Sequence, residues 1–178
     1  MTMNGSRTIR IATTGPEQTR DLGQRIARAL RPGDVILLHG DLGAGKTTLA
    51  QGIAAGLGVS SPVQSPTFVL VHEHAGTTSD GRPVTLHHLD LYRLAGEDEV
   101  EAIGYDDYLS PEDGVSVVEW PERAGRVLPD RCLLVEIRAG SGDERTIALT
   151  AIGPDEAAQQ WLGSLEHRPG GPGIRSAS

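Results

Sequence analysis

The pattern G-x-x-x-x-G-K-S/T is matched at every position by Gly40-Asp41-Leu42-Gly43-Ala44-Gly45-Lys46-Thr47. Residues 35–39, directly before it, form an apolar run typical of a buried strand, and residues 48–57 after it are typical of a helix. A strand, a glycine-rich loop and a helix in this order let backbone N–H groups surround phosphate oxygens. We therefore expect a phosphate-binding loop, with Lys46 on the outer phosphates of a nucleotide and the Thr47 hydroxyl on Mg²⁺.

The cationic residue of this loop is of a type that occurs nowhere else in the chain. Lys46 is the only lysine among the 16 lysine and arginine residues of the chain. A slim ammonium fits between phosphate groups, whereas a planar guanidinium does not. The residue choice therefore favours a phosphate cradle over a glycine-rich turn that matches by chance.

Length and composition indicate one globular domain that does not present a broad nucleic-acid-binding face. A chain of 178 residues can bury a sizeable core, and its formal net charge of −8 argues against a large basic surface. No apolar stretch approaches the length of a membrane span, and the start of the chain does not resemble a signal peptide. Cys132 is the single cysteine, so we expect a buried, inert thiol and a cytoplasmic protein.

Strand and helix patterns alternate along the chain, which indicates an α/β domain over residues 7–162. Residues 67–74 and 84–89 favour a β-hairpin, and residues 115–118 favour a buried strand. Residues 163–178 are rich in glycine, proline, serine and arginine, so we expect a disordered C-terminal tail.

Two acidic residues follow apolar strands, where proteins with a phosphate loop place the acid that holds Mg²⁺. Asp90 ends the second strand of the predicted hairpin, and Glu119 ends the most apolar strand after the loop. A solvated or helix-capping carboxylate is the alternative for each. The Thr67 hydroxyl could also reach the metal or a phosphate, although Pro66 alone would explain a strand that starts there.

The hairpin also carries four histidines, His72, His74, His87 and His88. No cysteine is nearby and no H-x-x-E-H type pattern occurs, so we expect solvated strand histidines rather than a zinc site. Trp120 could stack on a base, anchor a partner or pack in the core.

Taken together, four segments resemble the TsaE (YjeE) family of bacterial ATPases: residues 40–48, Ser65-Pro66-Thr67-Phe68, residues 88–94 and Glu119-Trp120-Pro121-Glu122. The resemblance covers about residues 8–150. The turn at residues 77–81 and the tail beyond residue 162 do not resemble the family. It implies a role in synthesis of threonylcarbamoyladenosine in tRNA. It also implies a three-layer P-loop nucleotide-binding domain with a mixed, mainly parallel sheet.

The resemblance further implies a role for individual residues. Loop residues 40–48 would bind ATP or ADP. Trp120 would lie near the nucleotide, and residues 13–17 would lie near the adenine. Catalytic roles fall on Lys46, Asp90, Glu119 and Thr67, and Mg²⁺ contacts on Thr47, Glu119 and Asp90. The implied partners are TsaD and TsaB, the threonylcarbamoyl transferase complex, and tRNA would be contacted only indirectly.

Three other functions share this kind of loop. A GTPase would need an N-K-x-D motif, which is excluded because Asn4 is the only asparagine and Lys46 the only lysine. A small-molecule kinase would need an acceptor pocket and an arginine-rich lid, for which Arg123, Arg126 and Arg131 are candidates. A nucleotide-gated adaptor that does not hydrolyse ATP is the third alternative.

Overall fold

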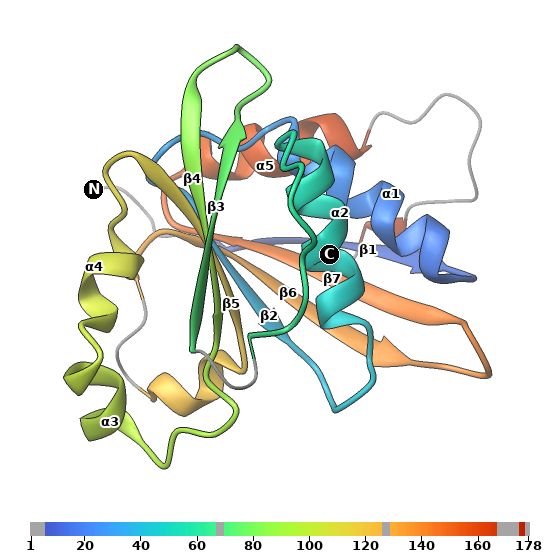
Figure 1. The fold of residues 1–178 in the computed structure, drawn as a ribbon. Coiled ribbons are helices and arrows are strands. Elements are labelled where there is room, and N and C mark those ends of the chain that lie inside the picture. Colours follow the sequence, from blue (N-terminus) through green and yellow to red (C-terminus); the bar gives the residue numbers. More distant parts are fainter. Residues whose placement is uncertain (1–5, 67–69, 126–128, 167–174, 177–178) are drawn as a thin grey trace.

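The computed structural model describes residues 6–66, 70–125, 129–166 and 175–176, which form one β-sheet with helices on both faces (Figure 1). The strands are β1 (Arg7–Thr13), β2 (Val35–His39), β3 (Val71–Thr77), β4 (Pro83–Asp90), β5 (Gly114–Glu119), β6 (Cys132–Ala139), β7 (Arg145–Ile152) and β8 (Arg175–Ser176). The helices are α1 (Pro16–Ala27), α2 (Lys46–Gly56), α3 (Glu97–Ala102), α4 (Tyr105–Leu109) and α5 (Asp155–Glu166), with a 3₁₀ helix η1 (Pro121–Ala124).

The strand order is β3-β4-β5-β2-β6-β7-β1-β8, and the sheet is mixed. Strands β4, β5, β2 and β6 form parallel ladders, and the remaining ladders on both sides are antiparallel. Strand β1 points the same way as these four, so the prediction of a mixed, mainly parallel α/β sheet is confirmed. Because β4, β5 and β2 are parallel neighbours, their carboxyl ends meet at one edge of the sheet.

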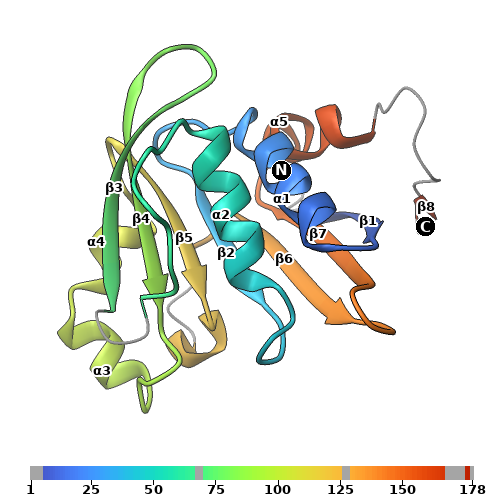
Figure 2. The ribbon, with the colours of Figure 1, turned by 45° about the vertical axis from the view of Figure 1, so that its right-hand side comes forward.

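Strand β2 is buried on both faces, which explains its continuous apolar sequence. Ile36 and Leu38 point into a core shared with α1, α2 and α5. Val35 and Leu37 point into a second core shared with α3, α4 and η1. The alternation along one strand therefore produces the expected three layers, which Figure 2 shows from a second direction.

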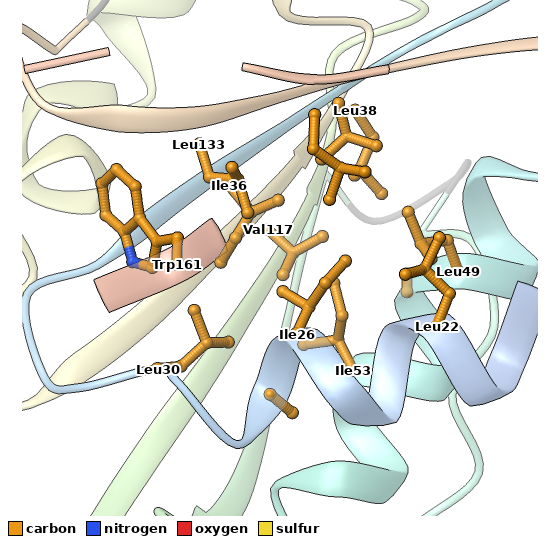
Figure 3. Close-up of a cluster of buried hydrophobic side chains, with 14 of the residues drawn as sticks. Leu22, Ile26, Leu30, Ile36, Leu38, Leu49, Ile53, Val117, Leu133 and Trp161 are labelled. Atoms are coloured by element: carbon orange, nitrogen blue, oxygen red, sulfur yellow. The ribbon is translucent and has the colours of Figure 1, made fainter. Parts of the chain in front are cut away.

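Helix α2, which begins at Lys46, is held against the sheet by close contact with α1. A Cβ atom built on Gly23 would lie 2.6 Å from the carbonyl oxygen of Leu49, and one on Gly52 would lie 2.3 Å from that of Arg20. The two backbones therefore touch, and larger residues would push α2 away from the sheet. Figure 3 shows the core below this contact, built from side chains of both helices and of the sheet: Leu22, Ile26, Leu49, Ile53, Ile36 and Val117.

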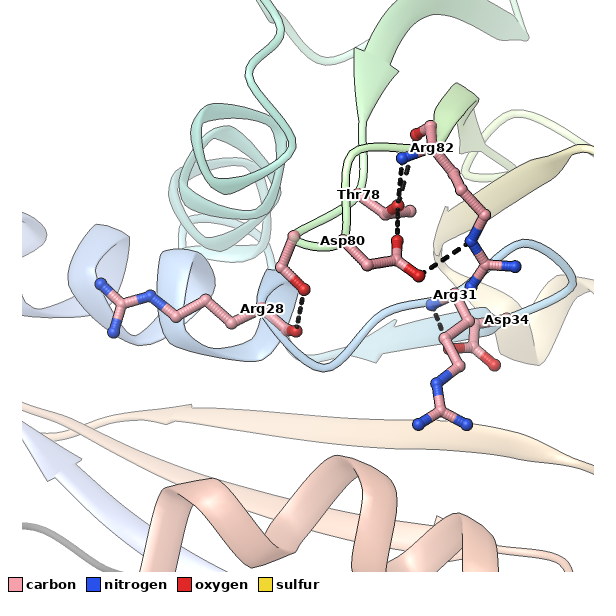
Figure 4. A network of polar contacts seen from close by, with 7 residues as sticks. Arg28, Arg31, Asp34, Thr78, Asp80 and Arg82 are labelled. Atoms are coloured by element: carbon pink, nitrogen blue, oxygen red, sulfur yellow. Dashed lines mark hydrogen bonds and ion pairs between the residues drawn. The ribbon is translucent and has the colours of Figure 1, made fainter.

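The turn between β3 and β4 folds back onto the end of α1 (Figure 4). Ser79 Oγ donates to the carbonyl oxygen of Arg28 at 2.8 Å, and Arg82 Nε donates to Asp80 Oδ2 at 2.9 Å. These contacts anchor the tip of the hairpin at the edge of the sheet away from the glycine-rich loop.

Two expectations for the C-terminal region need correction. The folded domain continues to Glu166, the last residue of α5, instead of ending at residue 162, because Leu165 extends the apolar face of this helix and is completely buried. The Leu165 carbonyl also accepts a bond from Arg25 Nη2 at 3.1 Å. Residues 175–176 form a short strand on β1 rather than a disordered segment, and residues 167–174 and 177–178 lie outside the described residues.

Two further expectations can be compared with the structure. Cys132 is buried, and burial raises the pKa of its thiol to about 11, which fits an inert side chain. Across the described part of the chain, no helix combines the length and the apolar character needed to cross a bilayer.

Candidate functional site

The glycine-rich loop joins the carboxyl end of β2 to the first turn of α2. Gly43 and Gly45 have φ angles of 76° and 112°, which residues with a Cβ atom rarely adopt. Gly40 is required for another reason: a Cβ atom there would lie 2.6 Å from the carbonyl oxygen of Ile137. The glycines therefore let the chain curl tightly beside β6 and turn straight into the helix.

The cation of the loop, Lys46, is held by the backbone of the loop itself. Lys46 is 4% exposed, and its Nζ donates to the carbonyl oxygens of Gly40 at 2.6 Å and Asp41 at 2.9 Å. Burial lowers the pKa of Lys46, and the carboxylates of Glu119, Glu122, Asp90 and Asp41 partly oppose this shift. Leu42, at the outer end of the loop, is 78% exposed.

Glu119 and Asp90 lie side by side at the ends of β5 and β4, where they form a register pair. Thr47 Oγ1 donates to Glu119 Oε1 at 3.1 Å. Asp90 is almost fully buried and accepts bonds from Ser65 Oγ at 2.6 Å and from the Tyr92 backbone N–H at 2.9 Å. Neither acid is therefore a solvated surface carboxylate.

This donor set fits Mg²⁺, which prefers oxygen ligands and keeps part of its water shell. The Thr47 hydroxyl and the Glu119 carboxylate already contact each other, and Asp90 adds a second carboxylate next to them. Among the described residues no group of three or more His, Cys, Asp or Glu side chains could hold a metal ion. The site therefore fits a magnesium ion that shares its coordination with phosphate and water rather than a metal enclosed by the protein.

Trp120 is half-buried at the same edge, with an unusual backbone. Its φ angle of 59° is the only positive one among the described residues other than glycine, and this conformation costs on the order of 1–2 kcal/mol. The Lys46 ammonium lies 4.1 Å from the centre of its ring, and the rings of Tyr92 and Trp120 are 4.8 Å apart. The indole of Trp120 therefore lies beside the loop cation and also packs against the core on this face of the sheet.

A cavity of about 210 Å³ opens over the loop, lined by Leu42, Gly43, Gly45, Lys46, Thr47, Thr48, Glu119 and Trp120. A second cavity of about 80 Å³ shares Gly43, Gly45 and Thr48 with it and extends to Gly15 and Pro16 at the start of α1. Residues 13–17, which the sequence resemblance associates with the adenine, thus lie next to the loop. A larger cavity of about 580 Å³ lies at the opposite edge of the sheet, away from these side chains.

Sequence reasoning missed Arg145, at the start of β7. Its Nε donates to the carbonyl oxygen of Ala44 at 2.8 Å, and its Nη1 donates to those of Gly142 and Glu144 at 2.8 Å. The guanidinium thereby ties the glycine-rich loop to the turn before β7. No local pattern could reveal the contact of Arg145 with the loop, because Arg145 and Ala44 are about a hundred residues apart in the sequence.

The expectation of solvated strand histidines is wrong for two of the four. His88 is completely buried and His74 is 9% exposed. His88 Nε2 lies 2.9 Å from Glu119 Oε1, the same oxygen that accepts the Thr47 hydroxyl. The pattern H-L-D at residues 88–90 carried the signal, because residues i and i+2 of a strand share a face and Asp90 was already a site candidate.

The segment after α2 contacts one acidic strand end and a histidine of the hairpin. Its Ser65 bonds to Asp90, its Ser61 Oγ lies 2.7 Å from His74 Nδ1, and its Val63 carbonyl accepts from Gln51 Nε2 at 3.0 Å. Thr67 and Phe68, which the sequence also associates with the site, lie outside the described residues. The role of Thr67 therefore stays a prediction.

A glycine-rich loop at the carboxyl edge of parallel strands, with carboxylates on the neighbouring strand ends, defines a P-loop α/β protein. The family model described as "Threonylcarbamoyl adenosine biosynthesis protein TsaE" matches residues 13–147, so the chain belongs to the TsaE family. The resemblance drawn from four short segments is thereby confirmed.

Individual relatives agree with this assignment. A tRNA threonylcarbamoyladenosine biosynthesis protein TsaE from Bacillus subtilis is 43% identical over 141 residues, covering 79% of this chain and 84% of the relative. The protein of the same description from Streptomyces coelicolor is 44% identical over 139 residues, and the match covers 75% of this chain and 90% of that relative. The crystal structure of Bacillus subtilis YdiB superposes with a TM-score of 0.72 at 33% identity, covering 93% of this chain and 99% of YdiB.

Proposed function

We propose that this protein is a Mg²⁺-dependent ATPase that supports threonylcarbamoyladenosine modification of tRNA by acting on the threonylcarbamoyl transferase complex. One observation carries the ATPase proposal: Lys46, Thr47 and Glu119 line the same cavity at the glycine-rich loop, and Thr47 bonds to Glu119. The biological setting comes from the relatives, which are described as proteins of this biosynthesis.

Each residue has a defined task in this proposal. The backbone N–H groups of residues 43–48 hold the β- and γ-phosphates, and Lys46 leaves the carbonyls of Gly40 and Asp41 to contact them. Thr47 and Glu119 would hold Mg²⁺, which neutralises phosphate charge when bound. Either Asp90 or Glu119 would orient the attacking water, and Thr67 would supply a further hydroxyl.

The kinase alternative receives little support from the arginines expected to form a lid. Arg131 belongs to the opposite edge of the sheet, where its Nη1 donates to Asp34 Oδ1 at 2.6 Å. Arg123 lies near the site, with its guanidinium 5.8 Å from the ring centre of Tyr92, and Arg126 is outside the described residues. Of the three arginines expected to form the lid, one described residue, Arg123, lies near the loop, and this is a weak basis for a kinase lid.

Nucleotide binding should be visible in the fluorescence of Trp120. We expect ADP with Mg²⁺ to change the tryptophan emission, because its ring lies 4.1 Å from the Lys46 ammonium that the phosphates would displace. Trp161, the only other tryptophan, is buried and donates from Nε1 to Asp34 Oδ2 at 3.1 Å, away from the loop. A Trp161→Phe variant should keep the signal and Trp120→Phe should lose it; the reverse result would contradict this placement of the nucleotide.

The complete proposal is tested by phosphate release from ATP. We expect slow release by the isolated protein and faster release after addition of purified TsaD and TsaB, because a partner surface would complete the segment that contains Ser65 and Thr67. A mixture containing the Lys46→Ala variant measures phosphate released by the partners themselves. Addition of tRNA then shows whether the modified nucleoside forms.

Three results would favour other functions. A fast rate in isolation that the complex leaves unchanged would indicate a stand-alone hydrolase. Phosphate transfer from ATP to a nucleoside or metabolite would indicate a kinase. ATP binding without phosphate release, even with the complex present, would indicate a nucleotide-gated adaptor.

A further inference from the structure

Two neighbouring histidines each bury a ring nitrogen that has no hydrogen-bond partner within the described part of the chain. These atoms are Nε2 of His74 on β3 and Nδ1 of His88 on β4. A buried polar atom without a partner loses its hydrogen bonds to water without replacing them, which destabilises the folded state. Two such atoms on adjacent strands therefore require a physical explanation.

The other nitrogen of each ring shows how the protons can be arranged. Glu119 is a carboxylate acceptor, so His88 Nε2, 2.9 Å away, carries a proton; in a ring with a single proton, Nδ1 is then an acceptor. If the Ser61 hydroxyl donates to His74 Nδ1, 2.7 Å away, the proton of His74 lies on Nε2. The two unpartnered atoms are then one donor and one acceptor.

The strand register places the two rings within reach of each other. His72 pairs with His88 and His74 pairs with Leu86, so His74 and His88 are diagonal neighbours on one face of the sheet. Side chains of this length can reach toward each other across such a diagonal. Burial lowers the pKa of His74, and the nearby imidazoles of His88 and His72 lower it further, so its ring is neutral at pH 7.

We propose that His74 Nε2–H donates to one water molecule that in turn donates to His88 Nδ1, so that two imidazoles form a hydrogen-bonded line from Ser61 to Glu119. The line makes His74 and His88 positioning residues. His88 orients the carboxylate beside Thr47, and His74 fixes the tautomer of His88. The part that concerns metal binding rests on the proposed function, in which Glu119 holds Mg²⁺.

The line gives the segment after α2 a contact with each acid of the site. Ser65 bonds directly to Asp90, and Ser61 reaches Glu119 through His74 and His88. A displacement of this segment would therefore release both carboxylates from their present orientations. A partner that binds the segment could control metal binding without touching the glycine-rich loop.

The tautomers can be measured in the wild-type protein without nucleotide. The chain has six histidines, and ¹H–¹⁵N spectra of the imidazoles at pH 8, with His74→Leu and His88→Leu for assignment, resolve which nitrogen carries each proton. We expect each of the two rings to carry its proton on Nε2. A proton on Nδ1 of either ring would overturn the line, whatever the protein does with ATP.

Metal affinity tests the positioning role. We expect His88→Leu to weaken Mn²⁺ binding to the ADP complex, measured by EPR, by roughly 10–100-fold, and His74→Leu to weaken it by a smaller factor. His88→Gln, whose amide can donate to Glu119, should recover part of the affinity. His72→Leu is the matched control, because it removes an imidazole from the same strand face outside the line.

The outcomes separate this inference from the proposed function. Equal Mn²⁺ affinity of His74→Leu and wild type, with unchanged far-UV circular dichroism, would overturn the coupling to Glu119. Absence of Mn²⁺ binding to the wild-type ADP complex would overturn the metal assignment, and with it the positioning role. The tautomer spectra would then still decide whether the line exists.

Discussion

Replacing Lys46 with alanine is expected to abolish measurable phosphate release, with a loss of at least roughly 10²–10³-fold for one electrostatic contact of this kind. Lys46 is the one lysine of the chain, and its ammonium lies at the mouth of the loop, held by the carbonyl oxygens of Gly40 and Asp41. No other cation among the described residues lines the cavity above the loop. The measurement is phosphate release from ATP in the presence of the transferase complex.

Lys46→Arg makes the test specific for the shape of the cation. It keeps the charge, but the planar guanidinium is too broad for a pocket formed by two backbone carbonyls and the Trp120 ring, so we expect it to fail as well. Arg10→Ala, which removes an exposed cation from β1, is the control for net charge and should behave as wild type. Hydrolysis by Lys46→Arg at the wild-type rate would contradict the phosphate-cradle interpretation.

Glu119→Gln and Asp90→Asn are each expected to lower the rate of hydrolysis by roughly 10²–10³-fold while the protein stays folded. Each substitution removes a negative charge and keeps the shape of the side chain. The amide oxygens can still accept from Thr47 at position 119 and from the Tyr92 N–H at position 90. The measurements are the rate as a function of Mg²⁺ concentration and the thermal unfolding midpoint.

The matched control is Glu122→Gln, which removes a nearby carboxylate that is 40% exposed and lies 3.8 Å from His39 Nε2. We expect a small effect, because a solvated carboxylate outside the cavity contributes little to metal binding. If Glu122→Gln lowered the rate as much as Glu119→Gln, the effect would come from net charge near the loop rather than from metal ligation. A large drop in the unfolding midpoint of Glu119→Gln would instead assign Glu119 a structural role.

Much of the fold and half of the site follow from local sequence patterns. The apolar run of β2, the glycines and the start of α2 are neighbours in the chain, so their physics acts within about twenty residues. Asp90 and Glu119 were candidates because each ends an apolar strand, and parallel strands bring such ends to one edge of the sheet. The domain ends at Glu166 rather than at residue 162, because the burial of Leu165 against the core outweighs the polar composition around it.

The remaining features depend on contacts between residues far apart in the chain. The sequence alone determined a phosphate loop, its cation and two acidic strand ends, because local spacing sets which groups a turn or strand end presents. Only the tertiary structure decided that Arg145 ties down the loop, that Trp120 faces Lys46, and that His88 contacts Glu119. The physical reason is that sheet order and register set these contacts, and both result from the packing of the whole core rather than from any local pattern.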